Sequence, residues 1–220
     1  MTPRWPMLLA LGVILTMAGP PPPLAAGPTR EEALTALADA GDAADHRRHG
    51  VLALGETGLM ADLPELAAAL RDADQLVRAF AENAMWQLWS RSGDADIDRL
   101  FAIGVEQMSA RRGELAVQTF TEIVQRRPQF AEGWNKRATV YYLLGEYQKS
   151  LADCDEVMKR NPYHFGALSG YGMIYLQLDQ PAHALDYFQQ ALGVNPNLES
   201  IRQTVEMLKT LLIQRRKDTL

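Results

Sequence analysis

Two consecutive stretches of the sequence decide the fold: AEGWNKRATVYYLLGEYQKSLADCDEVMKRNPYH (residues 131–164) and FGALSGYGMIYLQLDQPAHALDYFQQALGVNPNL (residues 165–198). Their small, aromatic and proline residues recur at a step of 34 residues, and residues 97–130 carry an earlier copy of the pattern. The matching series are Pro128, Pro162 and Pro196; Gly104, Ala138 and Gly172; Ala116, Ser150 and Ala184; and Phe120, Cys154 and Phe188. A fixed period of this length is typical of stacked structural repeats.

Each of the three units predicts two helices around a short turn. In the middle unit the helices are expected over 131–144 and 147–160, on either side of Gly145-Glu146. Small residues such as Gly172 allow neighbouring helices to approach closely, and rings such as Phe188 fill the space between layers. The second helix ends at Asn161-Pro162, because proline lacks an amide donor and restricts the residue before it.

A further helix is predicted after the third unit. Ile201, Val205, Leu208 and Leu212 follow one another at steps of 4, 3 and 4, which places them on one helix face. Repeat arrays need a terminal cap with a polar outer face. Residues 199–220 are therefore expected to form a capping helix and tail.

The repeated stretches resemble the tetratricopeptide repeat family, whose units carry a large residue, a small one, a tyrosine, a turn glycine, an alanine, an aromatic and a proline. The residues that carry the resemblance in the middle unit are Trp134, Ala138, Tyr141, Gly145, Tyr147, Ser150, Cys154, Val157 and Pro162. The first unit departs from the pattern, with Gln107 at the tyrosine place and Arg111 at the turn-glycine place. The third unit has Asp179 at that turn. The resemblance implies an all-α, right-handed superhelix (solenoid) of helical hairpins.

In this family the first helix of each unit lines a concave groove, and the resemblance implies the same here. The residues expected to bind a peptide or helix in the groove are Phe101, Val105, Asn135, Lys136, Thr139, Tyr142, Ser169 and Met173. Asn135 would hydrogen-bond a peptide backbone and Lys136 would attract a carboxylate. Phe101, Tyr142 and Met173 would hold apolar side chains.

Family members that bind chaperone tails clamp a C-terminal carboxylate with a cluster of Lys, Asn and Arg. The corresponding places hold Phe101, Val105, Lys136, Gly166 and Gly170, so Lys136 is the only basic residue among them. The clamp is therefore expected to be missing. The two glycines either admit a bulky partner or reflect close packing.

Residues 28–96 lack the 34-residue period and show a weaker one of 31. Arg47 recurs as Arg78, and the segment from Gly50 to Leu54 recurs from Ala81 to Met85. This pattern is similar to a HEAT-type repeat; degenerate tetratricopeptide hairpins are the alternative. Residues 27–96 hold 6 Lys+Arg against 13 Asp+Glu. Trp86 and Trp89 are expected to join this acidic region to the array, in preference to stacking on a ligand.

Residues 1–27 are typical of a secretory signal peptide. Arg4 precedes an apolar run from Met7 to Ala18, which is followed by four prolines and then by small residues around Ala26. The run of 12 residues is shorter than the roughly 20 that span a membrane. A cleaved signal predicts a periplasmic or secreted protein. The alternative is a protein anchored in the membrane by an uncleaved segment.

Catalytic and metal-binding patterns are not found in the sequence. Cys154 takes the aromatic place of its unit and is expected to be buried and inert. His46 and His49, with Asp42 and Asp45, are interpreted as an exposed polar face, since a metal site needs more convergent ligands. His164 and His183 are interpreted as surface histidines, and the run Asp153, Asp155 and Glu156 as a solvated face.

The composition of the chain argues against further classes of protein. The net charge is −5, and the sequence shows no dense basic stripe, which argues against nucleic-acid binding. One cysteine excludes a disulfide framework. We therefore expect a non-catalytic protein–protein interaction module without cofactor, metal or small-molecule substrate, exported as an adaptor or assembly factor. The alternative is a structural helper that docks its acidic region on a basic partner surface.

Overall fold

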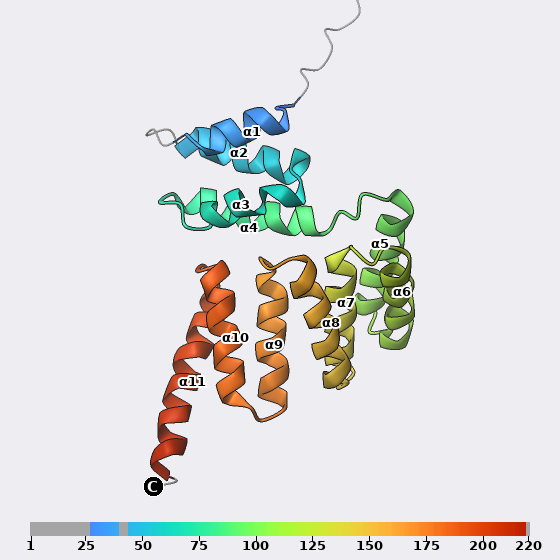
Figure 1. Ribbon diagram of the computed structural model, residues 1–220, viewed down its shortest axis with the longest axis vertical. Coiled ribbons are helices and arrows are strands. Elements are labelled where there is room, and N and C mark those ends of the chain that lie inside the picture. The colour runs from blue at the N-terminus through green and yellow to red at the C-terminus, as the bar shows by residue number, and fades with distance from the viewer. Residues whose placement is uncertain (1–26, 40–43, 219–220) are drawn as a thin grey trace, which may run out of the picture.

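The computed structural model describes residues 27–39 and 44–218. The export segment expected over residues 1–27 lies, apart from Gly27, outside the described residues. Over the described ranges the chain forms α-helices and one 3-10 turn, and no strand. The all-α helical-repeat solenoid predicted from the sequence is confirmed (Figure 1).

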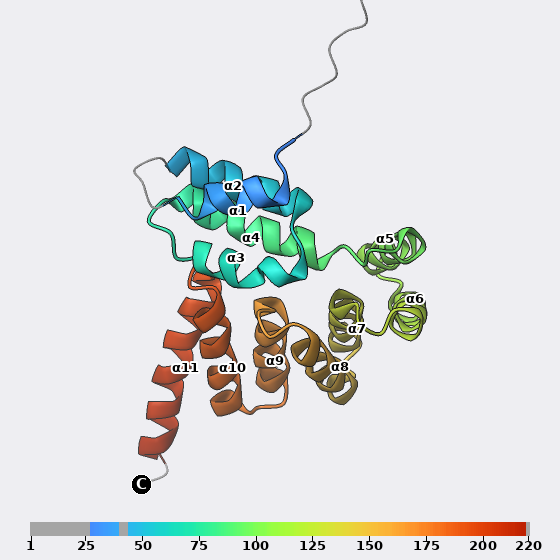
Figure 2. The same ribbon diagram turned by 45° about the horizontal axis from the view of Figure 1, so that its top comes forward.

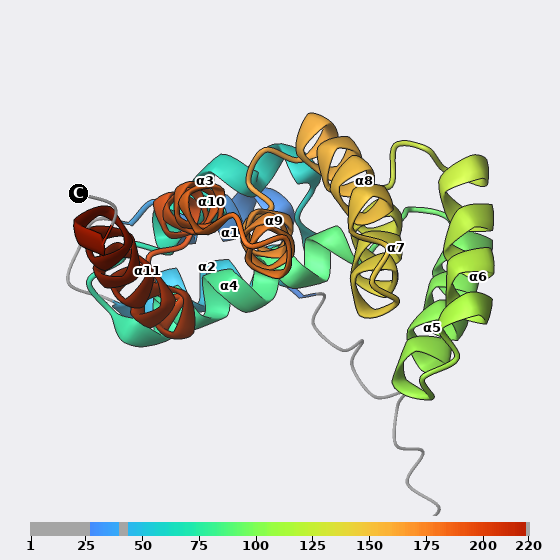
Figure 3. The ribbon, with the colours of Figure 1, turned by 90° about the horizontal axis from the view of Figure 1, so that it is seen from below.

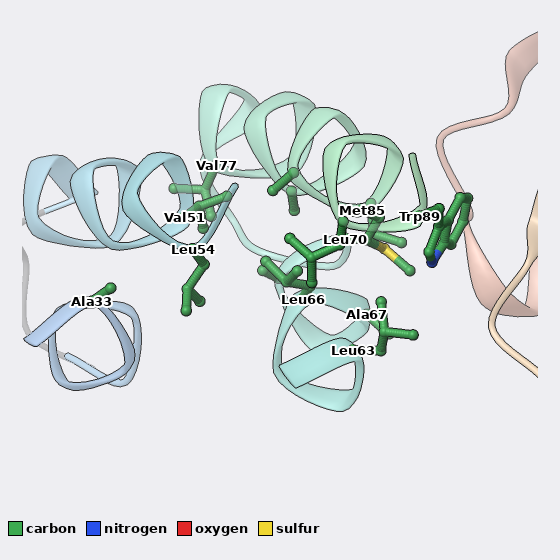
Figure 4. Close-up of a cluster of buried hydrophobic side chains, with 14 of the residues drawn as sticks. Ala33, Val51, Leu54, Leu63, Leu66, Ala67, Leu70, Val77, Met85 and Trp89 are labelled. Atoms are coloured by element: carbon green, nitrogen blue, oxygen red, sulfur yellow. The ribbon is translucent and has the colours of Figure 1, made fainter. Parts of the chain in front are cut away.

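The first part of the molecule, here called the N-terminal module, is built from the first four α-helices. Its elements are α1 (Arg30–Leu37), α2 (Ala44–Thr57), η1 (Met60–Asp62), α3 (Leu63–Ala69) and α4 (Gln75–Trp89). Leu54, Leu66, Leu70 and Met85 are fully buried between them, and Trp89 lies at the edge of this cluster (Figure 4). The HEAT-like interpretation of this module stays a prediction.

The second part, here called the array, contains the repeated sequence. Its helices are α5 (Ala95–Ser109), α6 (Gly113–Arg126), α7 (Ala131–Leu143), α8 (Tyr147–Arg160), α9 (Phe165–Gln177), α10 (Pro181–Val194) and α11 (Glu199–Asp218). Consecutive helices pack against one another, and the view from below follows them from α5 to α11 (Figure 3). The repeated small residues sit where the aromatic rings need space: a Cβ on Gly104 would lie 2.6 Å from the Phe120 ring.

The turns inside the units share one backbone conformation. Arg111, Gly145 and Asp179 are 34 residues apart, and all three have positive φ angles, of 57°, 77° and 52°. The left-handed conformation is costly for residues with a Cβ. In the first and third units, Arg111 and Asp179 therefore adopt the positive φ angle that Gly145 adopts in the second unit.

The last helix covers the end of the array. Val205 and Leu208 are buried against Ala184 and Phe188 of α10, as the apolar stripe predicts. The outer face is less polar than expected, because Met207 is 63% exposed and Ile213 is 59% exposed. Among the described helices, none combines the length and the hydropathy required to cross a membrane.

One charged residue assigned to a solvated face is buried. Asp153 on α8 is only 4% exposed and receives the Arg137 guanidinium of α7, with Nε 2.7 Å from Oδ2. Burial raises the pKa of Asp153 above its ordinary value, more than the Arg137 contact lowers it. The interpretation of Asp153 as part of a solvated run is therefore wrong: it forms an inter-helix ion pair.

The N-terminal module lies across one end of the array (Figures 1 and 2). Phe165, the first residue of α9, belongs to the same apolar cluster as Trp89. Polar contacts reinforce this junction between the module and the array, here called the seam. The Asn195 amide donates to Glu82 at 3.0 Å, and the Asn197 amide donates to the Leu70 carbonyl at 2.8 Å. Trp86 and Trp89 do join the two parts, and they contact the start of the third unit although the first unit follows them in sequence.

Candidate functional site

A pocket of about 260 Å³ opens between α7 and α9, with α8 forming its floor. Two helices wall it through side chains at helical spacing, because positions three and four apart share a face. Its lining residues are Asn135, Ala138, Thr139 and Tyr142 from α7; Gly166, Ser169, Gly170, Met173 and Ile174 from α9; and Ser150 and Cys154 from α8. Five of the eight residues predicted to bind a peptide line it: Asn135, Thr139, Tyr142, Ser169 and Met173.

The polar groups of the pocket are mostly satisfied within their own helices. The Thr139 hydroxyl donates to the Asn135 carbonyl at 2.9 Å, and the Ser169 hydroxyl donates to the Phe165 carbonyl at 2.8 Å. Both hydroxyl oxygens can still accept a hydrogen bond. The pocket is lined by no Asp, Glu, Lys or Arg among the described residues. This chemistry suits an uncharged group with an apolar body.

The edges of the pocket are apolar and partly exposed. Tyr142 is half-buried, with its ring centroid 6.0 Å from that of Tyr147. Met173 is 40% exposed. Cys154 lies at the floor, and burial raises the pKa of its thiol to about 12, so it stays protonated at neutral pH. An unreactive Cys154 agrees with the sequence analysis.

Phe101 and Val105 lie outside this pocket. Phe101 packs edge-on against Phe120 and Phe130, with ring centroids 6.0 Å and 5.4 Å apart. Val105 is half-buried against the same cluster. The side chains of Phe101 and Val105 therefore belong to the core between the first and second units.

Lys136 also lies outside the pocket and is held at the seam. Its ammonium is 2.9 Å from Glu132 Oε1 and 5.7 Å from the centroid of the Trp86 ring. Asn135 lines the pocket, but its amide donates to both Glu132 oxygens, at 3.2 Å and 3.1 Å. Asn135 was expected to bind a peptide backbone and Lys136 a carboxylate of the partner. Both side chains instead contact Glu132 of this chain.

Glu132 is bound to a histidine that the sequence analysis placed at the surface. His164 is fully buried, so that interpretation is wrong. Its Nδ1 accepts the Ala167 amide at 3.0 Å and thereby caps α9, which leaves Nε2–H to donate to Glu132 at 2.8 Å. Burial alone would raise the pKa of Glu132, but His164 and the Lys136 charge outweigh it and lower the pKa. A sequence signal for His164 is its place directly before the predicted first helix of the third unit. A side-chain acceptor at this N-cap position caps the helix by accepting from an amide of its first turn.

The two glycines of the third unit have different surroundings. A Cβ on Gly166 would lie 2.7 Å from the Trp86 ring, so Gly166 reflects close packing. A Cβ on Gly170 would meet only Cys154 Sγ, at an ordinary 3.7 Å. The N-terminal module therefore closes the end of the groove beside Gly166, and the pocket stays open beside Gly170.

The histidines of α2 have local partners. His46 Nδ1 is 3.0 Å from Asp39 Oδ2, and His49 Nδ1 is 2.6 Å from the Asp45 carbonyl. Asp42 lies outside the described residues. Within the described ranges, no group of three or more potential ligands could hold a metal ion.

Comparison with known proteins gives a consistent family. A family model described as tetratricopeptide repeat matches residues 129–196. A TPR repeat-containing protein of Rhizobium etli is 32% identical over 120 residues, which cover 54% of this chain and 59% of that protein. Hsp70-Hsp90 organizing protein 1 of Glycine max is 25% identical, over 48% of this chain and 19% of that protein. The chain thus covers less than two thirds of the length of each of these relatives.

Solved structures share the fold of the array. The TPR domain of Sgt2 from Aspergillus fumigatus superposes with a TM-score of 0.53 at 17% identity, over 56% of this chain and 83% of that one. The first TPR domain of Spaghetti (RPAP3), bound to an HSP90 peptide, gives 0.52 at 18% identity, over 55% and 96%. Residues 129–196 therefore match the tetratricopeptide repeat family in sequence, and the array shares the fold of solved tetratricopeptide repeat domains.

Proposed function

We propose that this chain is a protein–protein interaction module that binds a peptide or helix of its partner in the pocket between α7 and α9. The observation that carries the proposal is the pocket itself, where five predicted contact residues meet around an uncharged cavity. The fold supports it, since similar arrays include domains solved with chaperone peptides bound. The expected contact is a bulky, uncharged side chain inserted beside Gly170, with backbone donors reaching Thr139 and Ser169.

The pocket can be tested by site-specific photocrosslinking in the native cell. A photoreactive phenylalanine derivative is placed at Tyr142, and a matched control carries it at Gln189, an exposed position on α10. We expect adducts with one protein or a small set from Tyr142 and none of these from Gln189. The same adducts from both positions, or none from Tyr142, would contradict the proposal.

Charge insertion gives an independent test. Met173→Glu and Thr139→Glu place a carboxylate in a pocket without charged lining, whereas Gln189→Glu adds the same charge on the outer side of α10. We expect the crosslinked partner to be lost with the first two variants and kept with the third. Circular dichroism of all three checks that the fold is intact.

The acidic N-terminal module is the alternative docking surface. Its support is weaker, because three of its carboxylates are already paired with arginines: Asp62 with Arg30, Asp72 with Arg47, and Asp74 with Arg48. A photocrosslinker at the exposed Glu65 distinguishes the two surfaces. Adducts from Glu65 in place of Tyr142 would favour the alternative.

We further propose that the chain acts after export, as an adaptor or assembly factor outside the cytosol. The support is the order of charge, apolar run, prolines and small residues in residues 1–27. Mass spectrometry of the N-terminus in fractionated native cells tests it. A mature chain that starts near residue 27 is expected, an intact Met1 in the membrane fraction indicates an anchored form, and an intact Met1 in the cytosol overturns the proposal.

A further inference from the structure

Gly170 is the part of the pocket between α7 and α9 that indicates what the pocket binds. Three other glycines on α5 and α9 each lie against an aromatic ring of this chain: Gly104 against Phe120, Gly166 against Trp86, and Gly172 against Phe188. In each pair, a Cβ on the glycine would lie 2.4 to 2.7 Å from a ring atom. A Cβ on Gly170 would have only Cys154 Sγ within 4 Å among the described residues, at 3.7 Å. Gly170 therefore leaves open the kind of space that a ring fills at the other three glycines.

The pocket has room for a ring. Its volume is about 260 Å³, whereas a cavity of about 150 Å³ is enough to hold a benzene molecule. Gly166 and Gly170 are four residues apart on one face of α9, so this wall has a strip without side chains. Ala138 on the α7 wall is also small. The two walls therefore leave a slot that suits a flat group better than a branched one.

The side chains around the slot suit an aromatic ring chemically. Met173 lines the pocket and is partly exposed, and methionine sulfur makes favourable contacts with aromatic rings. The ring of Tyr142 lies at the rim, where its hydroxyl accepts the Gln177 amide at 3.4 Å. Aromatic pairs are favourable in offset or edge-to-face arrangements. A charged side chain would lose its water here without gaining a counter-charge, because the described lining residues are all uncharged.

We propose that the pocket takes an aromatic side chain of the partner, with its ring against Gly170, between Met173 and Tyr142. The inference rests on the proposed function and names the class of side chain that the pocket recognises. An aliphatic side chain would fill the same space but would make neither the sulfur–ring nor the ring–ring contact.

Three neutral probes with the same backbone test the proposal on the full chain: N-acetyl-phenylalaninamide, N-acetyl-leucinamide and N-acetyl-alaninamide. Nuclear magnetic resonance of labelled methyl groups follows Met173 and Ile174 in the pocket, with the exposed Met207 of α11 as the control. We expect the phenylalanine probe to saturate the pocket signals with a Kd on the order of 1 mM. The leucine probe should bind at least about threefold more weakly, and the alanine probe should cause no saturable shift.

The probes are compared by their Kd values, because a ring by itself enlarges the shifts of nearby methyl groups. A leucine probe that binds as tightly as the phenylalanine probe would overturn the proposal. Shifts of Met207 that parallel those of Met173, or a phenylalanine probe that does not saturate, would overturn it as well.

Two glycine positions supply a matched pair of variants. Gly170→Val places two methyl groups in the slot and is expected to weaken binding of the phenylalanine probe at least about tenfold. Gly193→Val makes the same change at an exposed position of α10, where a Cβ would meet nothing within 4 Å, and should leave the Kd within about twofold. Equal Kd values for the two variants would refute the placement of the ring beside Gly170. Thermal unfolding of both variants verifies that they are folded.

This result is distinguishable from a failure of the proposed function. A leucine probe that binds as tightly as the phenylalanine probe, with the Tyr142 adducts retained in the cell, would overturn the ring preference alone. Tight binding of the phenylalanine probe without adducts from Tyr142 would support the ring preference and overturn the proposed function.

Discussion

The N-terminal module and the array are both stacks of helices that pack around buried apolar side chains, but they differ in the contacts that supplement this packing. The module adds three arginine–aspartate pairs between sequence-distant segments, such as Arg47–Asp72 with Nε 2.7 Å from Oδ2. The array relies on small residues facing rings, such as Gly172 against Phe188. The comparison shows that a repeated apolar contact leaves a period in the sequence, whereas ion pairs between individual residues do not.

The largest effect is expected where a ring of the array is removed. Phe188→Ala deletes a fully buried side chain between α9, α10 and α11 and should lower the free energy of unfolding by about 4 kcal/mol. Urea denaturation followed by circular dichroism measures it. The neighbouring exposed Gln189→Ala should change it by less than about 0.5 kcal/mol. A small effect of Phe188→Ala would mean that the array is not held by its rings.

The seam between the two parts should be nearly as sensitive. Glu132→Ala leaves the Nε2–H of His164 buried without an acceptor and should cost about 3 kcal/mol. The matched control is Glu122→Ala, which removes an exposed partner of Arg126 and should cost less than about 1 kcal/mol. Glu132→Gln keeps an acceptor for His164 and should fall between the two. Equal losses for Glu132→Ala and Glu122→Ala would argue against a structural role of the seam.

Acid should distinguish the module from the array. Hydrogen bonds from their arginine partners hold the pKa values of Asp62, Asp72 and Asp74 below the ordinary range. Their stabilising contribution is complete above the unfolded carboxyl pKa of about 3.9 and is lost as the pH falls through the lowered values. Asp153 in the array has a raised pKa, so its protonation favours the folded state as the pH falls through that value.

The module should therefore open before the array as the pH is lowered from about 4 to about 2. Amide NMR signals of Leu54 in the module and of Phe188 in the array report the two parts separately. Asp72→Asn should make the module less stable at neutral pH and its stability less dependent on pH. Simultaneous loss of both signals in the wild type would contradict the difference between the two parts.

The smallest effect is expected at exposed helix pairs. Glu199→Gln removes the surface partner of Arg202 at the start of α11 and should change the free energy of unfolding by less than about 1 kcal/mol. Added salt should reduce even this difference. A larger loss would indicate that the start of α11 contributes to the seam through more than the Asn197 contact.

Much of the array could be predicted because its contacts are local or recur at the same step. The positions of Gly104, Phe120 and Pro128 return one unit later, so the pattern identifies the helices and the turns between them. Five predicted groove residues meet in one pocket for the same reason, because spacing on α7 and α9 fixes which side chains share a face.

Two errors, at Lys136 and His164, come from contacts with a segment far away in the chain, and one, at Asp153, comes from a contact between consecutive helices. Lys136 and His164 have ordinary local sequence contexts. Trp86 and Trp89 of the N-terminal module contact the partly exposed Lys136 and the fully buried His164. Asp153 is buried because Arg137 on the preceding helix reaches it. The positions of Lys136, His164 and Asp153 in the sequence do not indicate which residues they contact.

The sequence alone determined that residues 97–198 form an array of helical hairpins, since a 34-residue period in small and aromatic residues is compatible with few other packings. Only the tertiary structure decided which part of the groove stays open. Packing of the module on the array buries Glu132 and His164, and it places Trp86 beside Gly166. The physical reason is that residues close in sequence determine the periodicity of a helix. The docking of two helical stacks depends on surfaces formed by residues far apart in sequence.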